Sequence, residues 1–372
     1  MSTRKGQAKW DDKAKRWRIS VQKDGVRRAF YSSNPSTRGK FEAERKADHW
    51  LDTGSQNENI RLGAAWDEFL NYTLDKGKGG TRQKGTANHK KHEQMGRLYI
   101  LPVLTKNKKV MSITEAQWQK CIDIKYKDGL SKKSLQNIRG SITSFCKYMR
   151  RNGVKIDTPE IEIPDDAPVK ERKILQPDAL KMLFSEDSIK AYGKDRQCHY
   201  IHAWRFQVLS GFRPGEICGL QKSDIKDDVV TVNRSVNIDG EITSGKNTRA
   251  NRSVYLSKLQ RQILDEQAKM LQSKGIVTKW IFAAPDGGPG NEKSMYKTWL
   301  KFCEQRGFRC SLYELRHTLV SYAQDKVPEN LLKSIVGHSK SMDTFGVYGH
   351  QVDGDLQRAA GYIDDLFKDL VK

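Results

Sequence analysis

The sequence predicts a multidomain protein. A small antiparallel β-sheet with one helix is expected at the N-terminus, an all-α domain in the middle, and a mixed, mainly α domain with a small β-sheet at the C-terminus. The chain has 372 residues, more than a single domain usually holds. Hydrophobic residues make up 37% of it, which is enough to fill real cores. The hydrophobic pattern also changes twice, from short β-prone runs to helical stripes and then to a mixture of both.

The N-terminal segment, residues 1–55, alternates short β-prone runs with turn signals. Asp24-Gly25 lies between the runs RWRISVQK and VRRAFYSS, and an Asp-Gly pair in that position predicts a β-hairpin. A helical pattern follows, with apolar residues on one face and a stop signal at Gly54. This segment is therefore expected to form a small antiparallel sheet with one helix.

Residues 58–157 instead carry the periodicity of amphipathic helices. Two apolar stripes occur at helical spacing, formed by Leu62, Trp66, Phe69 and Leu70 and by Ile138, Ile142, Phe145 and Met149. The run TPEIEIPDDAP (158–168) is rich in proline and acid and predicts a linker. Residues 169–372 combine helical patterns with a β-rich stretch at 228–256, and an amphipathic helix from Leu356 ends the chain.

The chain carries a formal net charge of +22. Ten Lys/Arg lie within residues 1–30 against three Asp, and ten lie between 76 and 109 against one acid. Such an excess repels itself unless a polyanion binds, so nucleic acid is the first candidate partner and an anionic membrane surface the second. No apolar run approaches the roughly 20 residues that span a bilayer, and the N-terminus has no apolar signal core. The six cysteines include no CxxC pair, which argues against a zinc site or a disulfide framework and favours reduced thiols in a cytoplasm.

Two arginines are distinguished by their local setting. In VLSGFRPGEICGL (208–220), Arg213 precedes Pro214 where a helix is expected to begin, and a helix N-terminus favours anions. In LYELRHTLVS (312–321), Arg316 falls on the apolar stripe of a helix, although burying an unpaired guanidinium is costly. Taken alone, Arg213 is equally well explained as a surface arginine that starts a helix.

Three further motifs are weak when each is considered singly. ITSGKNTRANRSVYL places Lys246 in a glycine-containing turn between β-like runs, where a lysine is usually just solvated. In KSIVGHSKSMDTFGVYGH, His338 follows a helix stop at Gly337, and Tyr348 comes ten residues later. A histidine in this position is more often a helix cap than a catalyst, and a lone tyrosine is more often a packing residue.

As an ordered set, these motifs are specific. The sequence resembles the tyrosine recombinase family of phage and conjugative-transposon integrases over most of its length. The resemblance implies that residues 1–55 are a β-sheet module that binds arm-type DNA sites and that residues 58–157 are a helical core-site DNA-binding domain. Residues 169–372 would be the catalytic domain, whose C-terminal helix packs on a neighbouring protomer and links subunits on DNA.

The resemblance also assigns catalytic residues by position: Arg213 matches the first arginine, Lys246 the β-hairpin lysine, Arg316 the second arginine, His338 the histidine or tryptophan position, and Tyr348 the nucleophile. One position departs from the pattern, because the family usually has histidine three residues before the second arginine and this sequence has Tyr313. The part that Tyr313 plays in proton transfer is therefore open. The neighbouring His317 is not given the missing role, because its position points to the flank of the helix.

This residue set suits the transfer of a phosphodiester without a metal or another cofactor. Two arginine forks match the charge that builds on the non-bridging oxygens. Tyr348 would form a 3′-phosphotyrosyl bond and release a 5′-hydroxyl, and Lys246 would give the leaving oxygen its proton. Religation to another strand reverses the step. The expected function is therefore site-specific recombination that integrates and excises a mobile element.

The expected partner is double-stranded DNA at core-type and arm-type sites, bound by a homo-oligomer that is a tetramer in the synaptic complex. An excision factor or a host DNA-bending protein is a further candidate partner. No membrane is expected, and the expected location is the nucleoid in the cytoplasm of a bacterial host. The candidate DNA-contact residues are Trp17, Arg18, Arg27, Arg28, Arg82, Lys84, Lys90, Lys91 and Arg252. For any single N-terminal residue, a solvated basic face with a packed tryptophan is an equally good explanation.

Three other functions stay open at this point. A type IB topoisomerase-like enzyme would use the same tyrosine chemistry but relax DNA at a single site. A metal-dependent nuclease is suggested only by PDD (164–166) followed by ERK (171–173), a short spacing within a polar linker. A non-enzymatic basic DNA-binding protein, such as a repressor or an architectural protein, would need none of the catalytic residues.

Overall fold

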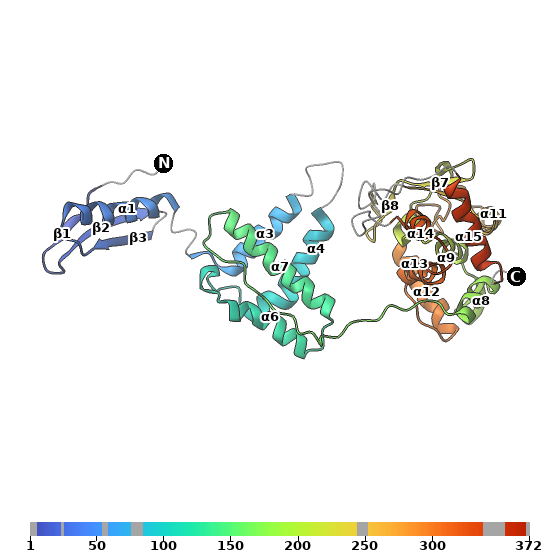
Figure 1. Cartoon of the computed structure of the whole chain (residues 1–372), viewed down its shortest axis with the longest axis horizontal. Helices are drawn as coiled ribbons and strands as arrows, with labels where there is room; N and C mark the ends of the chain where they lie inside the picture. The colour runs from blue at the N-terminus through green and yellow to red at the C-terminus, as the bar shows by residue number, and fades with distance from the viewer. Residues whose placement is uncertain are drawn as a thin grey trace. The chain divides into compact units, whose positions relative to one another are not determined.

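The structure is a computed structural model that describes residues 6–23, 26–53, 59–75, 85–243, 252–337 and 354–369. The chain separates into two compact units, Met1–Lys170 and Glu171–Lys372. Figure 1 follows the elements of both units along the chain. Within the described ranges, none of the helices is long and apolar enough to cross a membrane.

The N-terminal module consists of β1 (Lys9–Asp11), β2 (Arg16–Lys23), β3 (Val26–Ser32) and α1 (Thr37–Thr53). The three strands form one antiparallel sheet in the order β1-β2-β3, and α1 packs on one face of it (Figure 1). β2 and β3 pair as far as Lys23 and Val26, so the pairing of the strands confirms the predicted hairpin. The turn residues Asp24 and Gly25 and the stop signal Gly54 lie outside the described residues.

The helical module consists of α3 (Leu62–Asp75), α4 (Gly85–Met95), the π-helical turn η1 (Gly96–Ile100), α5 (Leu101–Leu104), the 3₁₀ turn η2 (Val110–Ser112), α6 (Glu115–Lys127) and α7 (Lys132–Arg151). Both apolar stripes predicted from the sequence contribute to its core, where the rings of Trp66 and Phe145 lie 4.9 Å apart. Gly96 is required in the turn after α4, because a Cβ at that position would overlap the indole of Trp66. The helical prediction for this segment is confirmed.

Residues 154–170, which we call the strap, pack against the helical module. Ile161 and Ala167 of the strap are buried in the helical core. Gln119 of α6 accepts a hydrogen bond from the Glu162 amide at 2.9 Å and donates one to the Glu162 carbonyl at 3.1 Å. The strap contains no helix or strand, apart from a turn at residues 165–167, and its prolines cannot donate the backbone hydrogen bonds that a helix needs. Most of the stretch predicted to be a linker is thus held in place, and the two units meet in sequence at Lys170.

The second unit is mainly helical. Its helices are α8 (Pro177–Ser185), α9 (Ile201–Ser210), α10 (Pro214–Cys218), α11 (Lys258–Ser273), α12 (Glu292–Gln305), α13 (Leu312–Ala323), α14 (Glu329–Val336) and α15 (Asp355–Phe367), with a 3₁₀ turn η3 (Lys222–Asp224). Its strands are β4 (Ser188–Ala191), β5 (Lys194–Gln197), β6 (Ile225–Lys226), β7 (Val229–Val232), β8 (Ser235–Val236), β9 (Ile242–Thr243) and β10 (Arg252–Tyr255). The strands form an antiparallel sheet of order β10-β7-β6 and two hairpins, β4-β5 and β8-β9. The helix α9 is buried along its whole length and lies at the centre of the core.

The C-terminal helix α15 is amphipathic, as the sequence predicts, and it packs on its own unit. Ile363 and Phe367 lie in the same hydrophobic core as α9. The carboxylate of Asp364 accepts hydrogen bonds from the backbone amides of Lys258 and Leu259, at 2.8 and 3.0 Å, and thereby caps the N-terminus of α11. Packing of this helix on a neighbouring protomer concerns the assembly on DNA and stays a prediction.

Candidate active site

Arg213 lies where α9 ends and α10 begins. Gly211 ends α9 with a φ of 63°, and a Cβ there would lie 2.8 Å from Leu319 Cδ2 and 3.1 Å from Val336 Cγ1. Glycine is therefore required both for the backbone conformation and for the close approach of α13 and α14. The chain then places Arg213 at the N-cap of α10, with Pro214 in the first turn as the sequence predicts.

The Arg213 side chain is held by a carboxylate in the first turn of α10. Glu216 Oε1 accepts a hydrogen bond from Arg213 Nη1 at 2.7 Å, and Glu216 Oε2 accepts one from the Arg213 amide at 3.0 Å. The Arg213 side chain is 30% exposed, whereas that of Glu216 is 4% exposed. The guanidinium is thus anchored by Glu216 and still reaches solvent, as a group that binds a ligand must.

Arg316 of α13 belongs to the same cluster. It is 4% exposed, and its Nη1 donates a hydrogen bond to the Gly211 carbonyl at 2.7 Å. Burial, and next the positive charges of Arg213 and Arg252, lower the pKa of Arg316 to about 10. The side chain stays charged near neutral pH, and its pKa reports two further guanidinium groups close by.

Glu216 is the carboxylate that Arg213 and Arg252 share. Arg252 of β10 donates from Nη2 to Glu216 Oε2 at 2.9 Å and from Nη1 to Glu216 Oε1 at 3.3 Å. Burial would raise the pKa of Glu216, but the charges and hydrogen bonds of Arg252 and Arg213 outweigh burial and hold the pKa below its ordinary value. Among the residues that the structure describes, three guanidinium charges in this cluster meet one carboxylate charge. A bound anion such as a phosphate would balance the two charges left over.

Arg252, predicted to contact DNA, is buried inside the protein. Its side chain is 8% exposed, its Nε donates to the Ile335 carbonyl at 2.8 Å, and its guanidinium carbon lies 4.7 Å from the centroid of the Phe212 ring. A Cβ on Gly337, the residue before His338, would lie 3.0 Å from Arg252 Cδ. Arg252 is therefore not on an exposed surface, because its strand turns the side chain toward α10 and α14, and its contact with DNA stays a prediction.

Tyr313 lies in the first turn of α13, one helical turn before Arg316, and is 49% exposed. The Tyr313 phenol acts to raise the pKa of Arg316, whereas Arg213 and Arg252 act to lower it. His317 is half-buried, and burial, followed by the charges of Arg172 and Arg316, lowers the pKa of His317. Tyr313 is thus the more exposed of the two side chains beside the arginine cluster.

The structure brings Arg213 and Arg316 together, as the sequence predicts. Lys246, His338 and Tyr348 lie outside the described residues. Glu216 was missed in the sequence, although a carboxylate three residues after an N-cap position is a recognisable first-turn signal. In the described parts of the chain, no group of three or more His, Cys, Asp or Glu side chains is arranged to hold a metal ion.

Alternation along β2 divides the N-terminal candidates between two faces of the sheet. Ile19 and Val21 pack toward α1, and Trp17 lies on the same side, with its ring centroid 5.5 Å from that of Trp10. Arg28 pairs with Val21 and therefore also belongs to the helix side. Trp17 and Arg28 thus lie on the side of the sheet that α1 covers, where Arg28 is still exposed, and their contact with DNA stays a prediction.

The opposite side, which we call the open face, carries Arg16, Arg18, Ser20, Gln22, Arg27 and Tyr31. Arg18 and Arg27 are both exposed there. The guanidinium carbon of Arg16 lies 4.0 Å from the centroid of the Tyr31 ring. The open face therefore combines exposed positive charge with an aromatic side chain.

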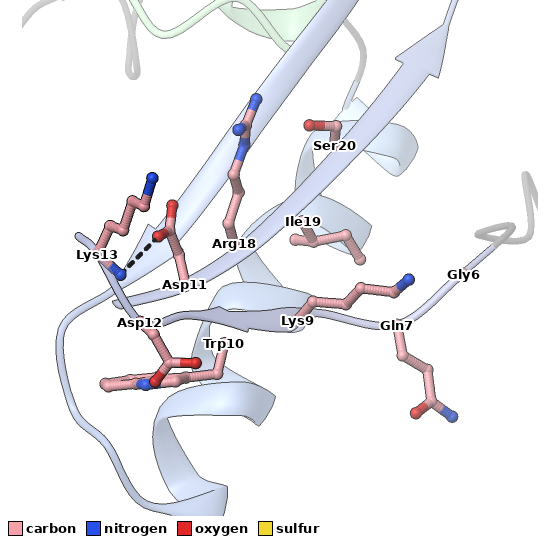
Figure 2. A pocket seen from close by; sticks show the side chains of 10 residues that line it. All are labelled: Gly6, Gln7, Lys9, Trp10, Asp11, Asp12, Lys13, Arg18, Ile19 and Ser20. Carbon is pink, nitrogen blue, oxygen red and sulfur yellow. Dashed lines mark hydrogen bonds between the residues drawn. The ribbon is translucent and has the colours of Figure 1, made fainter. Parts of the chain in front are cut away.

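A hollow of about 500 Å³ lies at the β1 edge of this module (Figure 2). Its lining includes Lys9, Arg18 and Ser20. Asp11 also lines it and accepts a hydrogen bond from the Lys13 amide at 3.1 Å, drawn as a dashed line in Figure 2. The hollow thus carries basic and hydrogen-bonding groups that extend the open face.

Two of the four candidates in the basic middle segment are described. Lys90 is exposed and Lys91 is half-exposed on α4, whereas His92 faces the core and shares a hydrogen bond with Ser141 at 2.9 Å. Arg82 and Lys84 lie outside the described residues. The two lysines are therefore on the solvent side of the helical module.

The acidic residues of the PDD group, which lies in the strap, have partners on α6 and α7. Tyr126 donates to Asp166 at 2.6 Å, and Lys132 lies 3.6 Å from Asp165. These contacts explain the acidic residues as anchors of the strap, which weakens the nuclease interpretation.

Comparison with known proteins shows which family and which folds the chain is similar to. Residues 173–354 match the family model described as the phage integrase family. A XerC-like tyrosine recombinase of Caldanaerobacter subterraneus subsp. tengcongensis is 22% identical over 380 residues, covering 92% of each protein.

Solved structures share the fold. An integrase of transposon Tn1549 in complex with transposon right end DNA has a TM-score of 0.62 at 16% identity, covering 81% of this chain and 98% of that one. A lambda integrase tetramer bound to a Holliday junction has a TM-score of 0.60 at 14% identity, covering 95% and 99%. The matched family segment includes the three clustered arginines and the positions of His338 and Tyr348. Together these matches show that the chain is a tyrosine-type site-specific recombinase.

Proposed function

We propose that this recombinase cleaves and rejoins DNA at attachment sites, with Tyr348 as the nucleophile, to integrate and excise a mobile element. The observation that carries the proposal is the cluster of Arg213 and Arg316. The negative charge of the neighbouring Glu216 carboxylate is too small to neutralise the positive charge of this cluster. Planar guanidinium groups match the non-bridging oxygens of a phosphodiester. These oxygens gain negative charge in the transition state. Hydrogen-bond donors that are already in position therefore lower the activation barrier.

In the proposed reaction, the Tyr348 oxygen bonds to phosphorus while the bond from phosphorus to the 5′ oxygen breaks. The products are a 3′-phosphotyrosyl bond and a 5′-hydroxyl, so the bond energy is conserved. Lys246 gives the leaving oxygen its proton, and the proton that the Tyr348 hydroxyl loses passes to solvent, from which Lys246 is reprotonated. His338 hydrogen-bonds the phosphate or positions Tyr348, and Tyr313 donates its hydroxyl to a phosphate oxygen. Attack by another strand's 5′-hydroxyl reverses the reaction.

DNA binding is assigned to other parts of the chain. Residues 1–55 would bind arm-type sites through the open face, because strands that carry arginine and glutamine can enter a major groove. Residues 58–157 would bind core-type sites, with Lys90 and Lys91 contacting phosphates together with Arg82 and Lys84. Residues 169–372 would hold the scissile phosphate. This division separates the choice of site from the chemistry.

The synaptic complex is proposed to be a tetramer on DNA. The lambda integrase relative is a tetramer on a Holliday junction, and the Tn1549 relative is in complex with transposon right end DNA. An excision factor or a host DNA-bending protein would bring arm-type and core-type sites together. The reaction would take place on the nucleoid, in the cytoplasm of a bacterial host.

A nicked duplex that carries the attachment site tests the proposal. The nick releases a short fragment after cleavage, so religation cannot erase the intermediate. Wild type should form a protease-sensitive covalent adduct with this duplex, and Tyr348→Phe should form none. An adduct with Tyr348→Phe would contradict the assignment of the nucleophile, and no adduct with wild type would favour a non-enzymatic DNA-binding protein.

A plasmid with two attachment sites separates recombination from topoisomerase-like relaxation. Wild type should exchange strands between the two sites and should still do so in EDTA. Relaxation of a supercoiled plasmid that lacks any attachment site, without strand exchange, would support the topoisomerase alternative. Loss of all cleavage in EDTA would support the nuclease.

A further inference from the structure

Arg252 contacts the segments that lead to Arg213 and to His338. Both Glu216 oxygens accept hydrogen bonds from it, and Glu216 in turn holds Arg213. Its Nε binds the carbonyl of Ile335 in the last turn of α14, and Gly337 packs against its side chain. Arg252 also opens β10, six residues after Lys246 in the sequence.

We infer that Arg252 is a positioning residue. It directs Arg213 through Glu216, and it fixes the segment before His338 through its hydrogen bond to the end of α14. The inference rests on the proposed roles of Arg213 and His338. It differs from the role of a DNA contact, since the side chain is 8% exposed and its guanidinium is engaged by protein groups.

Only arginine suits this position. The guanidinium places two donors against the carboxylate and a third against a carbonyl in one plane, which a lysine ammonium cannot do. The Phe212 ring lies against the guanidinium, with its centroid 4.7 Å away. These contacts fix β10, α10 and α14 relative to one another.

Arg252 also limits how strongly Glu216 attracts Arg213. Glu216 Oε1 accepts from Arg213 at 2.7 Å and from Arg252 at 3.3 Å, and Oε2 accepts from Arg252 at 2.9 Å. The carboxylate charge is therefore shared. Without Arg252, the buried carboxylate would bind Arg213 alone and draw it away from the phosphate.

The test measures single-turnover cleavage of the nicked attachment-site duplex by protein already bound to it. Arg252→Met keeps the length of the side chain and removes its charge. Cleavage should slow by about 100-fold, the loss typical of a misplaced catalytic group. The affinity for intact duplex and its salt dependence should match wild type, because no phosphate contact is lost.

A second substitution separates positioning from general damage. In the Arg252→Met background, Glu216→Gln removes the charge that competes for Arg213, so cleavage should recover by about 10-fold, or 1.4 kcal/mol in barrier. If Arg252 served only to stabilise the fold, the second substitution would disrupt another buried contact, and the cleavage rate would not recover.

Two further variants guard against misfolding. Arg205→Met removes a buried arginine elsewhere in the unit, which bonds the Leu183 carbonyl at 2.8 Å and pairs with Asp187. It should lower the melting temperature without slowing cleavage by the folded protein. Arg252→Lys should fold and cleave at a rate between those of wild type and Arg252→Met.

The inference is overturned by any of three results. These are wild-type cleavage by Arg252→Met or Arg252→Lys, no recovery on adding Glu216→Gln, or a salt slope lowered by about 1, which would mark a lost phosphate contact. If wild type itself forms no adduct, the proposed function fails. If wild type forms the adduct and one of these three results is found, only the inference on Arg252 fails.

Discussion

Arg316 lies on the apolar stripe of α13. A buried arginine is stable there only if hydrogen bonds or a bound anion compensate its charge. The Gly211 carbonyl accepts one of its hydrogen bonds, and the rest of the guanidinium lies within reach of the charges of Arg213 and Arg252. The leucines beside it pack α13 against α9. The helix is thus a rigid support that holds a charged group at the edge of the core.

Arg316→Lys should fold but cleave the nicked duplex about 100-fold more slowly or worse, because an ammonium is a point charge and cannot replace a fork of donors. Thermal melting checks the fold, and single-turnover adduct formation checks the chemistry. Arg205→Lys is the matched control, since it alters a buried arginine that the reaction does not use. Near-normal cleavage by Arg316→Lys would remove Arg316 from the active site.

Tyr313→His restores the residue that the family usually has at this position. If the position binds a phosphate oxygen, either side chain can donate the hydrogen bond, so the variant should cleave at close to the wild-type rate. The rate of adduct formation across pH measures this directly. A defect as severe as that of Tyr348→Phe would mean that the phenol has a role that histidine cannot fill.

Sequence order and spacing identified Arg213 and Arg316, because motif spacing along the chain is visible without a structure. The same reasoning overlooked Glu216 and did not reveal that Arg252 is buried. Whether a strand residue faces inward depends on what covers the strand, and here α10 and α14 cover Arg252. A long-range pair such as Glu216 with Arg252 leaves no local pattern in a single sequence.

At the scale of elements, the N-terminal sheet shows the same limit. The sequence located both long strands of the hairpin, since β-prone runs flank an Asp-Gly pair. It could not tell the faces apart, because the face that α1 covers is set by tertiary packing. Arg27 and Arg28 are neighbours in the chain, yet only Arg27 lies on the open face.

This pair supplies a matched test of the DNA-binding face. Arg27→Ala should weaken binding to an arm-type duplex by about 1–3 kcal/mol if the arginine reads a base, and Arg28→Ala should leave binding near wild type. Fluorescence anisotropy measures the affinity, and thermal melting shows whether either variant disturbs the fold. Equal losses from both variants, or a larger loss from Arg28→Ala, would contradict the assignment of the open face.

The junction of α15 with α11 can be tested in the same way. Asp364→Ala removes the cap on the Lys258 and Leu259 amides and should lower the free energy of unfolding by about 1 kcal/mol. Asp365→Ala changes the adjacent carboxylate, whose side chain is 78% exposed, and is the control. Chemical denaturation compares the two variants. Equal stability of both variants would show that the cap contributes little.

At the scale of the whole molecule, the described residues form three larger hydrophobic clusters and one small one, and each of the three regions that the change of pattern predicts contains one of the larger clusters. The strap was harder to predict, because proline and acid are also typical of free linkers. Ile161 and Ala167 are too widely spaced to suggest a strand or a helix, and only the surfaces of α6 and α7 explain their burial. Each region has its own core, so each region can carry basic residues on its own surface.

The net charge of +22 predicts how the intact protein responds to salt. If the basic segments contact about 6–10 phosphates, raising salt from about 50 to 200 mM should weaken DNA binding by about 10³- to 10⁵-fold, as bound counterions are released. Titrations of the Tyr348→Phe variant with an attachment-site duplex measure this slope without cleavage. Replacing one open-face arginine should lower the slope by about 1. A shallow slope, unchanged by that replacement, would mean that the excess charge serves something other than phosphate binding.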